Sequence, residues 1–175
     1  EQHGWLISRN DFYQAISSFK GAARRLEKVI DYQDFVFFKD FAHAPSKLLA
    51  TTTAVKKQFI DRKLVACLEL HSYSSLNKAF LAQYQGAFNA ADRAFIYFNP
   101  QNLERKRLDA LGKAEIIRAF DHDNLFVIDQ IDELREELLK INWGNKNLLM
   151  MSSGNFNELD FIALGKAITD TLKAG

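Results

Sequence analysis

The chain has 175 residues, 23 of them basic and 22 acidic, so its formal net charge is +1 and gives no electrostatic footprint for bulk binding of nucleic acid or an anionic membrane. No apolar run approaches the roughly 18 residues of a membrane span, and the length fits one domain. The only cysteine, Cys67, excludes an internal disulfide and a cysteine-rich metal site, and it indicates a reducing compartment, the cytoplasm.

The first part of the chain predicts a lead-in, a short helix and a β-hairpin. Residues 1–10 show no clear period, and residues 11–19 have the pattern of a short helix with a capping residue. Two segments rich in β-branched and aromatic residues, 25–30 and 34–39, predict two strands joined by a tight turn.

Beyond the hairpin, helical and strand patterns alternate. They come in the order helix 44–59, strand 63–70, helix 76–88, strand 93–98, helix 110–120, strand 125–128, helix 131–141, strand 147–151 and helix 161–172. Nearly continuous apolar strands such as 63–70 are typical of sheets covered on both faces. Right-handed crossovers then give an α/β, doubly wound domain. We predict a Rossmann-like three-layer domain with a mostly parallel sheet of about six strands and an N-terminal β-hairpin.

Polar residues gather where ligands bind in such sheets, beyond the carboxyl ends of the strands. The segments in this place are 40–46, 71–77, 99–102 and 152–158. We expect all four to lie along one edge of the sheet and to form one site. Turn formation is the alternative explanation, and it accounts better for Asn99 than for Asp40, His43 or His71.

Asp40 and His43 stand three residues apart at a strand-to-helix turn. An ionised Asp40 could accept hydrogen bonds from two hydroxyl groups, as acidic residues do from a ribose; alternatively it caps the following helix, which is the more common outcome. His43 could donate to a phosphate or a carboxylate, or it is a hydrogen-bonded, half-buried histidine.

A metal site is a further alternative at this edge. Asp40, His43 and His71 make a conceivable metal triad for a hydrolase, although their spacing fits no strong metal signature. Glu69 and His71 are expected to face opposite sides of the strand end, which argues against a metal shared by those two side chains.

Two other segments of the sequence have residues that could bind an anion. Ser152, Ser153, Gly154 and Asn155 follow a strand, and backbone N–H groups in a glycine-containing turn can cradle an anion, although a plain turn is more frequent. The pair Arg24-Arg25 suits bidentate binding of phosphate or carboxylate; the alternative is a solvated basic pair.

Several nucleotide and nucleophile motifs are absent from the sequence. It contains no G-x-x-x-x-G-K-[ST], no G-x-G-x-x-G and no G-x-S-x-G. The chain therefore does not hold ATP with a Walker loop of its own, and it has no nucleophile elbow.

Four sequence pieces stand in a fixed order: FKGAARRLE at 19–27, DFAHAP at 40–45, LELHSY at 68–73 and MMSSGNF at 150–156. Together they resemble the C-terminal domain of the Mur ligases, the ATP-dependent amide ligases of peptidoglycan assembly. The resemblance runs from about residue 18 to the end. It implies that 1–18 is a lead-in from a missing central ATP-binding domain and that 19–175 is the Mur ligase C-terminal domain.

The resemblance also implies an activity. ATP phosphorylates the muramoyl carboxylate, the amine of the second substrate attacks the acyl phosphate, and phosphate leaves. ATP and Mg²⁺ are held mainly by the central domain and the UDP sugar by an N-terminal one. This chain therefore carries no complete catalytic set and no metal ligand, and by itself it is expected to be inactive.

Carried over residue by residue, the resemblance places the nucleotide near the start of this domain. Asp40 falls on the aspartate that holds the ATP ribose, and Arg25 or its neighbour Arg24 on the arginine that meets the nucleotide. His43 falls on the histidine near the phosphates or the incoming amine.

The residues expected to contact the incoming substrate lie in two loops. They are His71, Ser72, Tyr73 and Ser74 in one loop and Ser152, Gly154 and Asn155 in the other. Several relatives carry arginine in the first loop and this sequence does not; Arg105 or Arg107 could supply the missing charge. The Asp-Asn-Pro-Arg motif of the diaminopimelate-adding relative is matched only by 99–101, without its arginine, so no diaminopimelate role is carried over.

The ending MSSGNF is most similar to members that join murein tripeptide to UDP-N-acetylmuramate in peptidoglycan recycling. Members that add L-alanine to the same nucleotide sugar are the near alternative. A non-catalytic nucleotide- or peptide-binding domain is the alternative from another class of protein.

Overall fold

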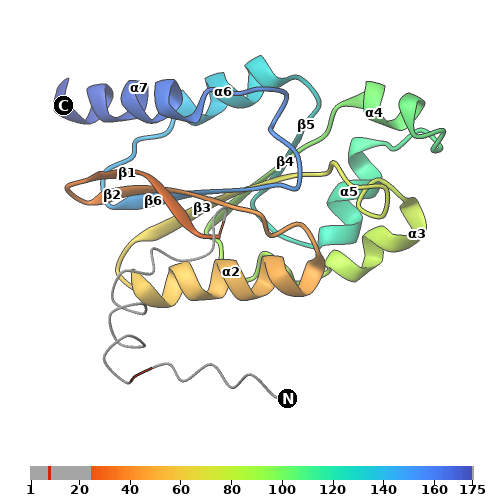
Figure 1. Cartoon of the computed structure of the whole chain (residues 1–175), viewed down its shortest axis with the longest axis horizontal. Helices are drawn as coiled ribbons and strands as arrows, with labels where there is room; N and C mark the ends of the chain where they lie inside the picture. Colours follow the sequence, from red (N-terminus) through yellow and green to blue (C-terminus); the bar gives the residue numbers. More distant parts are fainter. Residues whose placement is uncertain (1–7, 9–24, 175) are drawn as a thin grey trace.

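The computed structural model describes residue 8 and residues 25–174, and it consists of one sheet between two layers of helices (Figure 1). The strands are β1 (Glu27–Tyr32), β2 (Phe35–Asp40), β3 (Lys63–Glu69), β4 (Arg93–Tyr97), β5 (Leu125–Ile128) and β6 (Lys146–Met151). They form a 6-stranded sheet in the order β1-β2-β6-β3-β4-β5. Within residues 25–174, only the β1–β2 hairpin is antiparallel, and every other neighbouring pair of strands is parallel. The predicted fold is confirmed.

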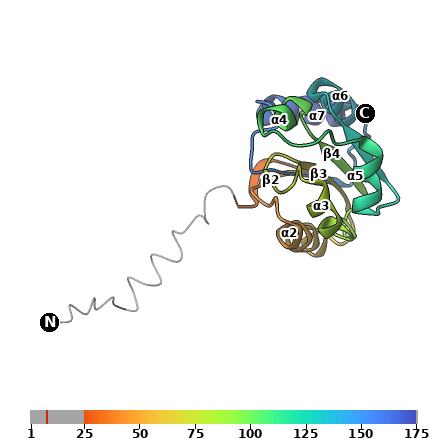
Figure 2. The same cartoon turned by 90° about the vertical axis from the view of Figure 1, so that its right-hand side faces the viewer.

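The helices cover both faces of the sheet (Figures 1 and 2). They are α2 (Pro45–Gln58), α3 (Lys78–Leu81), the 3₁₀ turn η1 (Ala82–Tyr84), α4 (Pro100–Arg105), α5 (Lys113–Phe120), α6 (Ile131–Leu139) and α7 (Phe161–Ala174). Helices α2, α3 and α5 lie against one face, and α6 and α7 against the other. No helix of the described residues is long and apolar enough to cross a membrane.

The core consists of two apolar clusters, one on each face of the sheet. Successive side chains of a strand point to opposite faces, so Val36 and Phe38 enter the cluster beneath α2, while Phe35 and Phe37 enter the cluster beneath α6 and α7. Cys67 lies fully buried in the second cluster, and burial raises the pKa of its thiol. The thiol is therefore part of the packing.

The sequence predictions differ from the structure in two connections. The predicted helix 76–88 is reduced to α3 and η1 followed by turns. Helix α4, not predicted, begins where Asn99 accepts a hydrogen bond from the Gln101 N–H (2.9 Å) and Pro100 occupies the first turn. The predicted helix 11–19 and the proposed domain boundary at 18/19 lie outside the described residues.

The register of the parallel strands brings their carboxyl ends to one edge. Asp40, the last residue of β2, lies opposite Met151 of β6, which lies opposite Leu68 of β3. Glu69 in turn lies opposite Tyr97 of β4. The loops that follow these four strands therefore start side by side, as predicted.

Candidate functional site

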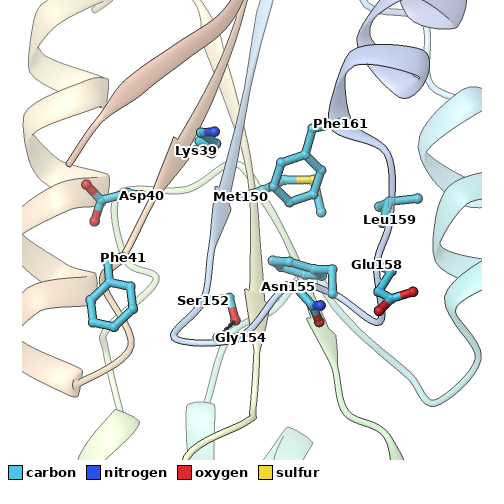
Figure 3. Close-up of a pocket in the computed structure, with 11 residues that line it drawn as sticks. Lys39, Asp40, Phe41, Met150, Ser152, Gly154, Asn155, Glu158, Leu159 and Phe161 are labelled. Carbon is cyan, nitrogen blue, oxygen red and sulfur yellow. Dashed lines mark hydrogen bonds between the residues drawn. The ribbon is translucent and has the colours of Figure 1, made fainter. Parts of the chain in front are cut away.

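The carboxyl edge of the sheet is hollowed beside the end of β2. This cavity, here called the Asp40 hollow, measures about 320 Å³ and lies between the end of β2 and the loop that follows β6. In Figure 3, Asp40 and Phe41 stand on one side of it, and Asn155 and Glu158 stand on the other.

Asp40 is held by two backbone N–H groups. Its Oδ2 accepts a hydrogen bond from Leu26 (2.5 Å) and its Oδ1 accepts one from Ala42 (2.7 Å). The first bond fastens the start of the hairpin, and the second turns the chain after β2. Helix α2 has Ala44 at its N-cap and no side-chain cap, so the idea that Asp40 caps this helix is wrong. Asp40 is instead a half-buried residue that lines the Asp40 hollow.

His43 is fastened to its own turn. Its Nδ1 lies 2.8 Å from the Phe41 carbonyl oxygen, and its ring meets the Phe41 ring edge-on at 5.1 Å between centroids. Its carbonyl accepts a hydrogen bond from the Tyr84 hydroxyl (2.5 Å), whose pKa burial raises to about 12. His43 thus fits the description of a hydrogen-bonded, half-buried histidine, with the Nε2 atom remaining for a ligand.

The two arginines proposed for the nucleotide are placed unequally. Arg25 is exposed and directly precedes Leu26, the residue whose N–H binds Asp40, but Arg25 is not among the residues that line the Asp40 hollow. Arg24 lies outside the described residues.

A buried carboxylate, Glu69, organises the neighbouring part of the edge. Its side chain is 2% exposed. Its Oε2 accepts hydrogen bonds from the Phe156 N–H (2.8 Å) and from the Ser152 hydroxyl, and its Oε1 lies 3.5 Å from His71 Nδ1. Burial, followed by the negative charges of Glu69 and Asp129, raises the pKa of Tyr97 to about 12.

The expectation that Glu69 and His71 face opposite sides is wrong. Residues two apart on a strand share a face, and both side chains turn toward the loop after β6. The metal triad is also not formed: within residues 25–174, no group of three or more His, Cys, Asp or Glu side chains could hold a metal ion.

The loop after β6 packs against this pair through Gly154. A Cβ atom at this position would lie 2.7 Å from His71 Cγ and Nδ1 and 2.8 Å from Glu69 Oε2, so only glycine fits without displacement. The Gly154 N–H donates to Ser152 Oγ (2.6 Å). This N–H is therefore engaged inside the turn, as in the plain-turn alternative to an anion cradle.

The same loop continues in an unusual backbone conformation. Phe156, Asn157 and Glu158 have φ angles of 50°, 51° and 64°. Left-handed backbone costs about 1–2 kcal/mol for each non-glycine residue. The Glu69–Phe156 hydrogen bond holds the first residue of this strained run. Of the three, only Asn157 is a residue type that signals this conformation in a sequence.

The loop after β3 is stabilised by its own serines. Ser72 Oγ lies 3.2 Å from Ser74 Oγ and donates to Ser75 Oγ (3.0 Å), while the side chain of Tyr73 is 60% exposed. Asn77 then caps α3 by accepting a hydrogen bond from the Ala79 N–H (2.9 Å).

A second cavity, here called the His71 hollow, lies next to the Asp40 hollow. It measures about 230 Å³, and both Glu69 and His71 line it. Asn155 and Glu158 line both cavities. Arg105, at the end of α4, lines the His71 hollow, whereas Arg107 does not. Helix α4, which the sequence pattern does not predict, thus brings an arginine to the site.

These features define a class: an α/β, Rossmann-like domain whose polar residues converge beyond the carboxyl ends of its strands into two adjoining cavities. No protein-family model matches the chain. The chain is 34% identical over 156 residues to a UDP-N-acetylmuramate–L-alanine ligase of Synechocystis sp., a match covering 83% of this chain and 29% of that protein.

Solved structures agree with that sequence match. The murein peptide ligase of Psychrobacter arcticus superposes with a TM-score of 0.67 and 26% identity, covering 89% of this chain and 32% of that one. The UDP-N-acetylmuramate–alanine ligase of Thermotoga maritima has the same fold, with a TM-score of 0.62, 15% identity and coverages of 92% and 32%. The chain is thus a Mur ligase family C-terminal domain. It spans less than a third of the length of the curated relatives it matches, between 29% and 32% for three of them.

Proposed function

We propose that the chain is the C-terminal domain of an ATP-dependent, ADP-forming amide ligase that joins murein tripeptide to UDP-N-acetylmuramate in the cytoplasm. Residues 19–175 form this domain and 1–18 lead in from a central domain. ATP and Mg²⁺ are held mainly by that central domain, and the UDP sugar by an N-terminal one. The observation that carries the proposal is the pair of adjoining hollows, which suits a reaction in which a nucleotide and an amine substrate meet.

The Asp40 hollow is proposed for the nucleotide. Each oxygen of the Asp40 carboxylate accepts one N–H hydrogen bond, so each keeps a lone pair for a ribose hydroxyl. The two backbone bonds fix the carboxylate before the nucleotide arrives, which lowers the cost of binding. Arg24 or Arg25 meets the phosphates, and His43 presents Nε2 to them or to the amine.

The His71 hollow is proposed for the incoming substrate. The loop residues proposed to contact it are His71, Ser72, Tyr73, Ser74, Ser152, Gly154 and Asn155. Of these, His71 and Asn155 line the His71 hollow, whereas Ser152 and Gly154 line the Asp40 hollow. Arg105 supplies a cation for a substrate carboxylate, because it lines the cavity from α4. A further hollow of about 420 Å³ shares Asn99, Gln101 and Asn157 with this one, and the combined volume favours a peptide over a single amino acid.

L-Alanine is the second candidate for the incoming amine. It is favoured by the sequence matches, since the relatives of Synechocystis and of Microcystis aeruginosa, at 34% and 30% identity, are both UDP-N-acetylmuramate–L-alanine ligases. The two candidates share the nucleotide, the UDP sugar and the amide-forming step, and they differ only in what fills the His71 hollow.

The test is ADP release by the protein that contains this chain together with an ATP-binding domain. It is incubated with ATP, Mg²⁺ and UDP-N-acetylmuramate, and with either murein tripeptide or L-alanine. ADP formed with the tripeptide supports the proposal, and ADP formed only with L-alanine selects the second candidate. No ADP with either amine would leave a non-catalytic binding domain. The 175-residue chain alone is expected to hydrolyse no ATP.

A further inference from the structure

The hydrogen bonds at the edge of the sheet give Glu69 and His71 a relation that goes beyond shaping a cavity. Glu69 is the one charged residue that is buried in the described part of the chain. Its two oxygens have different partners: Oε2 is occupied by the Ser152 hydroxyl and the Phe156 N–H, whereas Oε1 faces, among the described residues, the His71 ring. One half of the carboxylate holds the loop, and the other half is directed at an imidazole.

The His71 ring is oriented by its surroundings. Its Nδ1 atom is buried, has no hydrogen-bond partner among the described residues, and lies 3.5 Å from Glu69 Oε1. The backbone of Gly154 covers the same edge of the ring, which is why a Cβ there would collide with Cγ and Nδ1. The side chain as a whole is 36% exposed and lines the His71 hollow. The opposite edge, with Nε2, therefore faces the hollow.

This arrangement selects one tautomer of the imidazole. A carboxylate can only accept a hydrogen bond, so it favours the proton on Nδ1 and leaves the lone pair on Nε2. A separation of 3.5 Å is longer than a hydrogen bond, as is common for catalytic pairs before the substrate tightens them. A carboxylate behind an imidazole whose other nitrogen faces a substrate cavity is the arrangement of a general base.

We propose that His71 is the general base for the incoming amine and that Glu69 is the positioning residue that keeps its Nε2 unprotonated. The proposal rests on the proposed function. The amine arrives as an ammonium group and gives one proton to His71 Nε2. The freed lone pair forms the C–N bond at the acyl-phosphate carbon, the C–O bond to phosphate breaks, and phosphate leaves with that electron pair and takes up the second amine proton.

Glu69→Gln separates the two halves of the carboxylate. With its carbonyl oxygen at the Oε2 position, glutamine still accepts from Ser152 and Phe156. Its NH₂ group then faces His71 Nδ1 and donates to it, which moves the ring proton to Nε2 and removes the base. In the enzyme that contains this chain, kcat is expected to fall about tenfold or more, while KM for the amine changes less than about twofold.

Ser152→Ala is the matched control, since it loosens the loop but leaves Oε1 directed at His71. It is expected to raise KM for the amine by about threefold or more and to change kcat by less than about threefold. His71→Ala is expected to lower kcat about a hundredfold, and added imidazole restores at least a tenth of the lost rate, because free imidazole replaces the missing base.

The tautomer has a spectroscopic signature that does not depend on turnover. The ¹⁵N shifts of the His71 ring are expected to report the proton on Nδ1 in the unchanged chain and on Nε2 in the Glu69→Gln variant. If the enzyme releases ADP normally but Glu69→Gln keeps kcat within about twofold, or imidazole fails to rescue His71→Ala, the proposal is overturned and the ligase function stands. If the unaltered enzyme releases no ADP, the proposed ligase function is wrong, and the proposed role of His71 as general base is wrong as well.

Discussion

Two carboxylates, Asp40 and Glu69, lie at the same edge of the sheet, yet their surroundings differ. Asp40 ends β2 and Glu69 ends β3, and the two strands flank β6 on either side. Asp40 is half-buried and bonds to backbone 14 and 2 residues away. Glu69 is buried and bonds to groups 83 and 87 residues away. Asp40 thus stabilises its own turn and keeps capacity for a ligand, whereas Glu69 joins two distant loops.

The largest difference between the two carboxylates is expected in stability. Glu69→Ala leaves the Phe156 N–H and the Ser152 hydroxyl buried without their acceptor, which lowers the free energy of unfolding by about 3 kcal/mol. Urea unfolding measures this loss, and Glu69→Gln, which keeps an acceptor, is expected to lose about 1 kcal/mol or less. A loss of unfolding free energy below about 1 kcal/mol for Glu69→Ala would contradict the view that Glu69 stabilises the protein more than Asp40 does.

Gly154→Ala tests the packing around Glu69 from the loop that follows β6. The added methyl group meets the His71 ring and Glu69 Oε2 at less than 3.0 Å, so the variant is expected to unfold about 2 kcal/mol more easily. Gly144→Ala is the control, because its Cβ comes no closer than 3.4 Å to Asn142 Oδ1. Equal melting temperatures for the two variants would contradict the close packing of Gly154.

Asp40→Asn tests whether the other carboxylate serves a ligand as well as a turn. A carboxamide keeps one acceptor oxygen, so one of the two N–H bonds is lost, and stability is expected to fall by about 1 kcal/mol. In the enzyme, KM for ATP is expected to rise about tenfold.

Asp34→Ala is the control for this prediction, because, like Asp40→Asn, it removes the acceptor of one backbone N–H hydrogen bond. Asp34 lies in the turn between β1 and β2, at the other end of β2 from Asp40. It accepts a similar hydrogen bond from the Asn145 N–H (2.6 Å). Its substitution is expected to cost comparable stability without changing KM for ATP. A rise in KM for both variants would mean that Asp40 acts only through folding.

A third carboxylate, Asp92, lies directly before β4 at the amino edge of the sheet, and its substitution is expected to have the smallest effect on stability. Burial opposes its ionisation, but hydrogen bonds from Lys56 (2.8 Å) and the Leu64 N–H (2.7 Å) outweigh burial and hold its pKa below 3.8. A carboxyl group whose pKa is lower in the folded than in the unfolded chain stabilises the fold at any pH above its pKa in the unfolded chain. This stabilisation is lost as the pH falls through its pKa in the folded chain.

Asp92→Asn is therefore expected to lower the melting temperature at pH 7 and to differ less and less from the unchanged chain as the pH falls below 3.8. Because the side chain is partly exposed, the cost at pH 7 is expected to stay below about 1 kcal/mol. A difference that persists undiminished at pH 2 would contradict the ionic origin of the effect.

Hydrophobic patterning sufficed for the sheet but not for every connection. Strand 125–128 was predicted at its observed bounds, since its short apolar run is bordered by turn residues. The predicted helix 76–88 was too long, because Tyr84 and Phe88 stack on Phe120 of α5 from the 3₁₀ turn η1 and the turns after it, not from one helix face. Helix α4 was missed because the Asn99-Pro100 pair was interpreted as a turn, although the same pair begins a helix.

The order of strands and helices, the polar segments after the strands and the resemblance at Asp40 and Gly154 follow from the sequence alone, because local patterns and short motifs need no knowledge of distant contacts. Only the tertiary structure decided that Asp40 does not cap a helix, that Glu69 is buried against the loop after β6, that His71 turns toward it, and that Arg105 reaches the same cavity. Each of these depends on groups brought together from separate segments of the chain, and burial and hydrogen bonding between such groups leave no periodic signal in the sequence.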